Sequence, residues 1–220
     1  AAKDAVTYSL CNAGQVCCSV ERVYVPESIL DEFQKKVVEY AKDFKVGNGM
    51  DADTKVGPMV SRLQRDHVAQ QVDGAIKQGA KLLLKSDVPA DAGEETSFYP
   101  VTVLSNVTHD MDLFQRETFG PVVALSGFDG TEEEAIRLAN ETEYGLSGSV
   151  YSKDVDKARR VASRISCGQV GINCWALENM NIACPWVGHK HSGFGFHSGI
   201  DGFHQFSIPK SLVFEPSEDS

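Results

Sequence analysis

The sequence predicts an α/β fold: an open, mainly parallel twisted sheet with helices on both faces. Two observations lead to this prediction. Stretches with apolar residues at helical spacing alternate with short apolar runs up to Asn173, a pattern typical of strands joined by helical crossovers. The 220 residues, 42% of them hydrophobic, also suffice to bury a core without disulfides or metals.

In the first half of the chain, local signals delimit each element. Apolar spacing predicts a helix in residues 1–12, and a proline ends a strand over residues 20–25. Residues 27–44 carry apolar side chains at a 3.6-residue period. A Ser-x-x-Gln capping box opens the next helix, residues 61–78. The run AKLLLK, residues 80–85, is predicted to be a buried strand.

The second half continues this alternation. A Thr-x-x-Glu capping box and helical spacing predict helices, and β-branched apolar runs predict strands. We expect helices at residues 131–140 and 155–165, and strands at 101–104, 121–125, 148–152 and 169–173.

After Asn173 the periodicity is lost. The segment CWALENMNIACPWVGHKHSGFGFHSG is rich in glycine and aromatic residues, and such a long aperiodic loop usually forms a functional site or an interface. The run HQFSIPKSLVF predicts a last strand with an exposed edge. We therefore divide the chain into a domain, residues 1–205, and a C-terminal strand and tail, residues 206–220.

Charge and cysteine content exclude several classes of protein. The formal net charge of −10 argues against nucleic acid or an anionic membrane as a partner, and no apolar run approaches transmembrane length. The six cysteines form no CxxC pair and are interpreted as reduced thiols, which predicts the cytoplasm or an organelle matrix and not secretion. The start AAKDAVTYSL has neither methionine nor a signal pattern, which indicates a fragment.

The stretch CNAGQVCCSV raises the question of whether Cys17 is a nucleophile. A reactive thiol needs access and partial thiolate character, and the preceding Gly-Gln turn is able to present backbone N–H groups. Free cysteines are also among the most buried residue types, so the motif alone leaves a core role open. A disulfide between Cys17 and Cys18 is the less favoured alternative.

Two further patterns are weaker signals of a site. His189, His191 and His197 with Cys184 are of ligand type, but their spacing fits no tight zinc site, so we predict no metal. The glycines of HSGFGFHSG lack the strand before and the helix after that a dinucleotide fingerprint requires. In ETFGPVV, an acidic residue precedes a Gly-Pro corner and a strand, either as a solvated turn residue or as a ligand-binding carboxylate.

Taken together, the motifs resemble the aldehyde dehydrogenase family nearly from end to end. NAGQVCCSVERVYV resembles its cysteine signature, and further segments follow in the family's order. These segments are DADTKVGPMVS, QGAKLL, ETFGPVV, NETEYGLSGSVYSKD, CGQVGIN and PWVGHKHSGFG. Trp186 and the GFG at residues 193–195 lean towards the betaine and aminoaldehyde branch.

The resemblance implies a role for each matching residue. Cys17 matches the nucleophile that attacks the aldehyde, its backbone N–H supplies an oxyanion donor, and Val16 and Cys18 flank it and contact substrate. Glu117 matches the carboxylate that binds the nicotinamide ribose, and Phe119 matches the ring beside the nicotinamide. The tunnel for the aldehyde is implied at Trp175 and Trp186. The cofactor of such an enzyme is NAD or NADP.

The resemblance covers only about the second half of such enzymes. The nucleotide-binding domain, the general-base Glu, the oxyanion-hole Asn and the first strand of the catalytic domain have no counterpart here. Val187 replaces a family glycine, Phe196 and His197 replace an Arg-Glu pair, and the loop 174–184 is about two residues longer. We therefore expect no tight cofactor binding by this chain alone.

Three functions follow as hypotheses. The first is the catalytic domain of an NAD(P)-dependent aldehyde dehydrogenase, inactive as a dehydrogenase in this truncated form. The second is a cofactor-independent thiol esterase that uses Cys17. The third is a non-catalytic remnant that binds partners or forms a homo-oligomer, because the family pairs its last strand with a neighbouring subunit.

Overall fold

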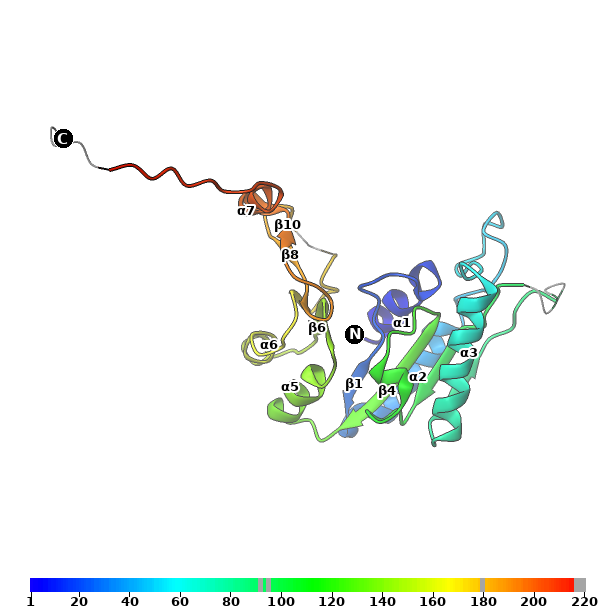
Figure 1. Cartoon of the computed structure of the whole chain (residues 1–220). Coiled ribbons are helices and arrows are strands. Elements are labelled where there is room, and N and C mark those ends of the chain that lie inside the picture. The colour runs from blue at the N-terminus through cyan, green and yellow to red at the C-terminus, as the bar shows by residue number, and fades with distance from the viewer. Residues whose placement is uncertain (91–92, 94–95, 179–180, 216–220) are drawn as a thin grey trace.

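A four-stranded sheet forms the centre of the protein, for which the computed structural model describes residues 1–90, 93, 96–178 and 181–215 (Figure 1). Its strand order is β1-β4-β3-β2. β4 pairs in parallel with β1 and β3, and β2 pairs with β3 in antiparallel orientation. The strands are β1 (Val23–Pro26), β2 (Lys81–Lys85), β3 (Thr102–Ser105) and β4 (Val122–Phe128).

Helices cover both faces of this sheet. In Figure 1, α2 lies behind the strands and α3 lies in front of them. The Ser61 hydroxyl accepts from the Gln64 N–H at 3.2 Å, so Ser61 is the N-cap that starts α3, as predicted. Valines from both helices and from β3 and β4 are fully buried in one continuous core. The helices are α1 (Ala2–Leu10), α2 (Glu27–Ala41), α3 (Arg62–Lys77) and the short α4 (Asp112–Gln115).

The rest of the chain packs as a second group of elements beside β1 (Figure 1). β6 pairs in parallel with β7, and the glycine-rich segment contributes strands to two short antiparallel pairs, β5 with β9 and β8 with β10. The helices are α5 (Glu132–Asn140), α6 (Val155–Ala162) and α7 (Gly199–Gly202), with 3-10 turns η1 (Cys11–Gly14) and η2 (Phe203–Phe206). The strands are β5 (Tyr144–Gly145), β6 (Ser147–Val150), β7 (Gln169–Ile172), β8 (Trp186–Val187), β9 (His189–Lys190) and β10 (Phe196–His197).

The predicted α/β class with a mainly parallel sheet is confirmed, and two details are corrected. β2 is not a buried strand: it is the antiparallel edge of the sheet, and 42% of Leu82 is exposed. The sequence could not place it, because an apolar run has the same composition at an edge and at the centre. α2 ends at Ala41, three residues before the predicted end at Phe44.

The predicted C-terminal strand is not formed within the described chain. Residues 207–215 pair with no other strand, and Figure 1 shows them leading away from the body of the protein. Ile208, Val213 and Phe214 are each at least 85% exposed. A strand needs a partner for its backbone groups, and no partner lies beside this segment in the described chain. Residues 216–220 of the predicted tail and residues 179–180 of the long loop lie outside the described residues.

No helix in the ranges that the structure describes combines the length and apolar character needed to cross a bilayer.

Candidate functional site

The candidate nucleophile lies on a turn between α1 and β1. Asn12, Ala13 and Gly14 all have positive φ angles, of 51°, 57° and 73°, so the chain reverses sharply at the end of α1. The Gln15 side chain then accepts from the Val60 N–H at 2.8 Å and fixes the turn to the segment before α3. Cys17 follows this bend directly.

The two neighbouring thiols lie in opposite environments. Cys17 is exposed, whereas only 4% of Cys18 is accessible. Burial, together with the adjacent Cys17 thiol, raises the pKa of Cys18 to about 11, which keeps Cys18 protonated at neutral pH. Of the pair, only Cys17 is accessible to a substrate, as a nucleophile must be.

A cleft of about 610 Å³ opens beside Cys17, between the four-stranded sheet and the second group of elements. β1 lines one wall along its whole length, and β6 lines the other. Of the residues predicted from the sequence, four line this cleft: Cys17, Cys18, Glu117 and Trp175. The structure thus brings together residues that lie more than 150 positions apart in the chain.

Trp175 closes the cleft against the nucleophile turn. Its indole N–H donates to the Cys18 carbonyl at 3.0 Å, and its ring stacks on Tyr8 of α1 with a centroid distance of 4.3 Å. The aromatic pair therefore gives the cleft a flat apolar surface next to Cys17. Tyr8 was not predicted from the sequence, although it lies on α1 just before the cysteine motif.

The ETFG turn lies directly against the nucleophile turn. A Cβ added to Gly14 would come within 2.0 Å of the Gly120 carbonyl oxygen, so the two backbones are in contact. Glu117 is exposed, and Phe119 is half-buried in a left-handed conformation with φ +51°. Glu21 and Gln64 hold this turn from its two sides through its backbone groups, a role that their positions in the sequence did not suggest.

The structure places the other three predicted residues, Phe119, Val16 and Trp186, outside the lining of the cleft. Phe119 belongs to the ETFG turn described above. Val16 is half-buried next to Cys17 in the turn. Trp186 lies in β8, paired with His197 of β10, in the group of elements beyond β6. Their predicted contacts with substrate remain predictions.

The histidines of the glycine-rich segment do not assemble into a metal site. His191 is within 3.1 Å of the Glu143 carboxylate, and His197 of the neighbouring Ser198 hydroxyl. Among the residues that the structure describes, no three His, Cys, Asp or Glu side chains are grouped to hold a metal ion.

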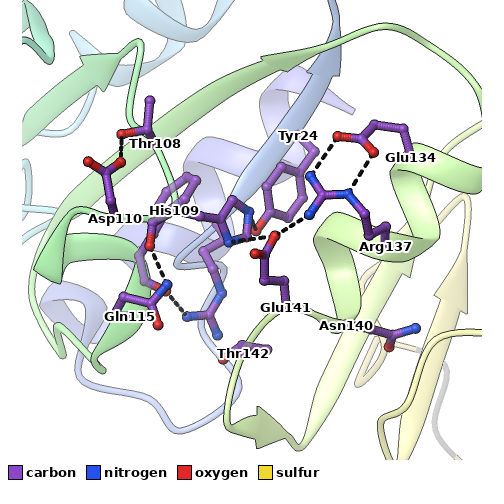
Figure 2. A network of polar contacts seen from close by, with 12 residues as sticks. Tyr24, Thr108, His109, Asp110, Gln115, Glu134, Arg137, Asn140, Glu141 and Thr142 are labelled. Carbon is purple, nitrogen blue, oxygen red and sulfur yellow. Dashed lines mark hydrogen bonds and ion pairs between the residues drawn. The ribbon is translucent and has the colours of Figure 1, made fainter.

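A second polar cluster links the sheet to α5 beside the cleft (Figure 2). His109 Nε2 lies 2.9 Å from the Tyr24 hydroxyl, and its Nδ1 lies 3.6 Å from Glu141. Arg137 then bridges Glu141, at 2.6 Å, and Glu134, at 2.7 Å. Burial raises the pKa of Tyr24 to about 12 and lowers that of His109, so both groups are neutral near pH 7.

Comparison with known proteins gives one consistent answer. Residues 1–212 match the sequence pattern of the aldehyde dehydrogenase family. The chain is 41% identical over 202 residues to a betaine aldehyde dehydrogenase of Bacillus subtilis, covering 91% of this chain and 41% of that protein. It is 38% identical over 206 residues to the succinate semialdehyde dehydrogenase Sad of Escherichia coli, covering 94% and 43%.

Solved structures agree with this comparison. A betaine aldehyde dehydrogenase point mutant of Staphylococcus aureus, crystallised with NAD+, superposes with a TM-score of 0.86 at 38% identity, covering 95% of this chain and 42% of that chain. A mutant of aldehyde dehydrogenase C of Pseudomonas syringae, with NAD+ and octanal, gives 0.88 at 33% identity, covering 99% and 44%. The chain thus spans about two fifths of the length of the curated relatives it matches.

Proposed function

Since the chain belongs to the aldehyde dehydrogenase family, we propose that it is the catalytic domain of an NAD(P)-dependent enzyme that oxidises aldehydes to carboxylic acids. The observation that carries this proposal is the asymmetry of the two cysteines. Cys17 is exposed in the cleft, and Cys18 is buried and held protonated. An accessible thiol beside an apolar cleft suits attack on a small organic carbonyl.

In the proposed reaction, the Cys17 thiolate attacks the aldehyde carbon and forms a C–S bond, and the carbonyl oxygen becomes an oxyanion. The backbone N–H of Cys17 is the donor that this chain offers to the oxyanion. NAD(P)+, when bound, supplies the hydride acceptor that turns this adduct into a thioester. Water then cleaves the thioester, which releases the carboxylic acid and restores the thiol.

The cofactor side of the proposed site consists of Glu117 and Phe119. The exposed Glu117 carboxylate lies in the cleft and is able to accept hydrogen bonds from ribose hydroxyls. The ring of Phe119, two residues on, offers an apolar surface for the nicotinamide. Several of the similar proteins are named betaine aldehyde dehydrogenase, which supports betaine aldehyde as the first substrate to test.

Limited alkylation tests the nucleophile. We expect substoichiometric iodoacetamide at neutral pH to label Cys17 well before Cys184, because a catalytic thiol must be reactive as well as accessible. Cys184 is the matched control, since it is exposed as well. Mass spectrometry of the digested protein measures both rates, and equal labelling of the two thiols would contradict a catalytic role for Cys17.

The chain alone should form no NADH steadily from an aldehyde. The resemblance places the general base and the nucleotide-binding domain outside these 220 residues. Absorbance at the NADH band after addition of betaine aldehyde and NAD+ provides the measurement. A steady rate above that of Cys17→Ala would show that this chain carries a complete catalytic apparatus.

A second candidate, a thiol esterase, draws support from the exposure of Cys17. Attack on an activated ester needs only the thiolate and an oxyanion donor. Turnover of 4-nitrophenyl acetate should then fall to background in Cys17→Ala and persist in Cys184→Ala. Equal rates in the wild type and Cys17→Ala would exclude this activity.

A further inference from the structure

Glu21 links the nucleophile turn to the ETFG turn. It lies four residues after Cys17, just before β1, and it lines the same cleft. One oxygen of its carboxylate accepts from two consecutive backbone groups, the Thr118 N–H at 3.0 Å and the Phe119 N–H at 2.9 Å. These contacts join positions 97 and 98 residues apart in the chain.

The ETFG turn needs such an acceptor to keep its shape. Phe119 has φ +51°, a left-handed conformation that is unfavourable for a bulky residue unless its surroundings enforce it. The carbonyls of Thr118 and Phe119 accept from the Gln64 side-chain amide at 3.0 and 3.3 Å. Gln64 thus satisfies the carbonyls of these two residues, and Glu21 satisfies their N–H groups.

From these contacts we propose that Glu21 is a positioning residue, which fixes Glu117 and Phe119 relative to Cys17. The proposal rests on the function proposed above, in which Glu117 and Phe119 form the cofactor side of the site. The tight approach of Gly14 to Gly120 sets the distance between the two turns. Glu21 sets their relative orientation, because two hydrogen bonds to one oxygen leave the turn little freedom to rotate.

The electrostatic environment makes this link sensitive to pH. Burial raises the pKa of Glu21, while the Phe119 N–H, the Arg22 guanidinium and the Thr118 N–H oppose that shift. The Glu117 carboxylate adds to the increase. Ionised Glu21 is the stronger acceptor, so the link should weaken as the pH falls through this raised pKa.

Amide hydrogen exchange measured by NMR tests the link directly. In Glu21→Ala, exchange at Thr118 and Phe119 should accelerate about tenfold or more, since both amides lose a hydrogen bond to a charged acceptor. In Glu21→Gln the amide oxygen can accept in the same place, so protection should largely return. Glu39→Ala, on the exposed face of α2, is the matched control and should change neither amide.

Two outcomes would overturn the proposal. One is unchanged exchange at both amides in Glu21→Ala while the amides of α3 stay protected, and the other is equal loss of protection in Glu21→Gln and Glu21→Ala. The pH profile gives a third criterion: after correction for intrinsic exchange, protection should fall with acid in the wild type but not in Glu21→Gln. Parallel profiles would contradict the role of the carboxylate.

The same samples separate this proposal from the proposed function. Alkylation of Cys17 reports on the nucleophile without reference to the ETFG turn. An inert Cys17 with a Glu21-dependent exchange pattern would refute the catalytic role alone. A reactive Cys17 with exchange independent of Glu21 would refute the positioning role alone.

Discussion

The ionisation of the His109 side chain should affect the stability of the fold. It is half-buried between Tyr24 of β1 and Glu141 at the end of α5, with Arg137 and Arg22 also near it. Burial is the main cause that lowers its pKa below the ordinary value of 6.5, and Glu141 partly opposes this shift. The folded state therefore binds a proton at His109 less tightly than the unfolded chain does.

We expect the free energy of unfolding to decrease as the pH falls below about 6.5, the unfolded pKa of histidine. The unfolded state binds more protons than the folded state from that pH down to the lowered pKa of His109, so stability is lost across that interval. In His109→Gln this contribution should vanish. Urea unfolding between pH 5 and 8 measures the difference between the two proteins.

His191→Gln provides the control for this experiment. His191 is exposed, and its ion pair with Glu143 lies at the surface, where such pairs contribute little to stability. The free energy of unfolding of His191→Gln should vary with pH as that of the wild type does. If the free energies of unfolding of the wild type and His109→Gln differ by the same amount at every pH, the proposed titration of His109 is contradicted.

Single residues of the site were predictable to different degrees. The local motif drew attention to Cys17 but left a core role open, and only the folded turn shows that Cys17 is exposed and Cys18 is buried. The nucleophilic role of Cys17 stays a prediction. Glu21 could not be predicted, because its partners are backbone groups almost a hundred residues away. Trp175 was predicted near the substrate, but its hydrogen bond to the Cys18 carbonyl depends on packing between distant segments.

The contact between the nucleophile turn and the ETFG turn should be intolerant of any added atom. Gly14→Ala would place a methyl group 2.0 Å from the Gly120 carbonyl oxygen at φ +73°, so we expect a loss of about 3 kcal/mol or more from overpacking and backbone strain combined. Thermal and urea unfolding measure this loss. Alkylation of Cys17 should change as well, because the turn must shift to make room.

Two other glycines separate the effect of overpacking from that of backbone strain. Gly79 has φ +109° with no atom within 4 Å of an added Cβ, so Gly79→Ala should cost only the strain, about 1–2 kcal/mol. Gly49 has neither feature, and its alanine variant should be close to neutral. If Gly14→Ala proves no worse than Gly79→Ala, the two turns are not in the close contact described.

Helices and strands with local signals were predicted best. The N-cap hydrogen bonds at Ser61 and Thr131 both form, because each hydroxyl and the N–H that it accepts from lie within one turn of helix. The second bond of each predicted capping box was not predicted correctly. The Gln64 side chain donates instead to the ETFG turn, and the Thr131 N–H donates to Asp129. The pairs β5–β9 and β8–β10 were not predicted, since two-residue strands carry no period and their pairing depends on the glycine-rich segment folding back. β2 was predicted as a strand, but its edge position depends on the order of the whole sheet.

The exposed C-terminal segment makes the assembly state of the protein testable. Residues 206–214 present a row of apolar side chains without a partner in the described chain, of which Phe206, Ile208 and Phe214 are each at least 84% exposed. If this segment pairs with a neighbouring subunit, deletion of residues 206–220 should lower the mass measured by light scattering. An unchanged mass, with circular dichroism showing an intact fold, would count against an interface at this segment.

The cleft between β1 and β6 has a consequence for how the isolated chain behaves in concentrated solution. Within the part of the chain that the structure describes, each strand is paired on one side only and lines the cleft. Its other edge therefore offers backbone donors and acceptors without a strand partner in those residues. Unpaired strand edges of this kind pair with strands of other molecules and so promote aggregation. We expect the purified protein to increase the fluorescence of 8-anilinonaphthalene-1-sulfonate. We also expect it to form aggregates slowly that bind thioflavin T. The substitution Val23→Lys should suppress both effects if β1 is the strand that pairs with other molecules.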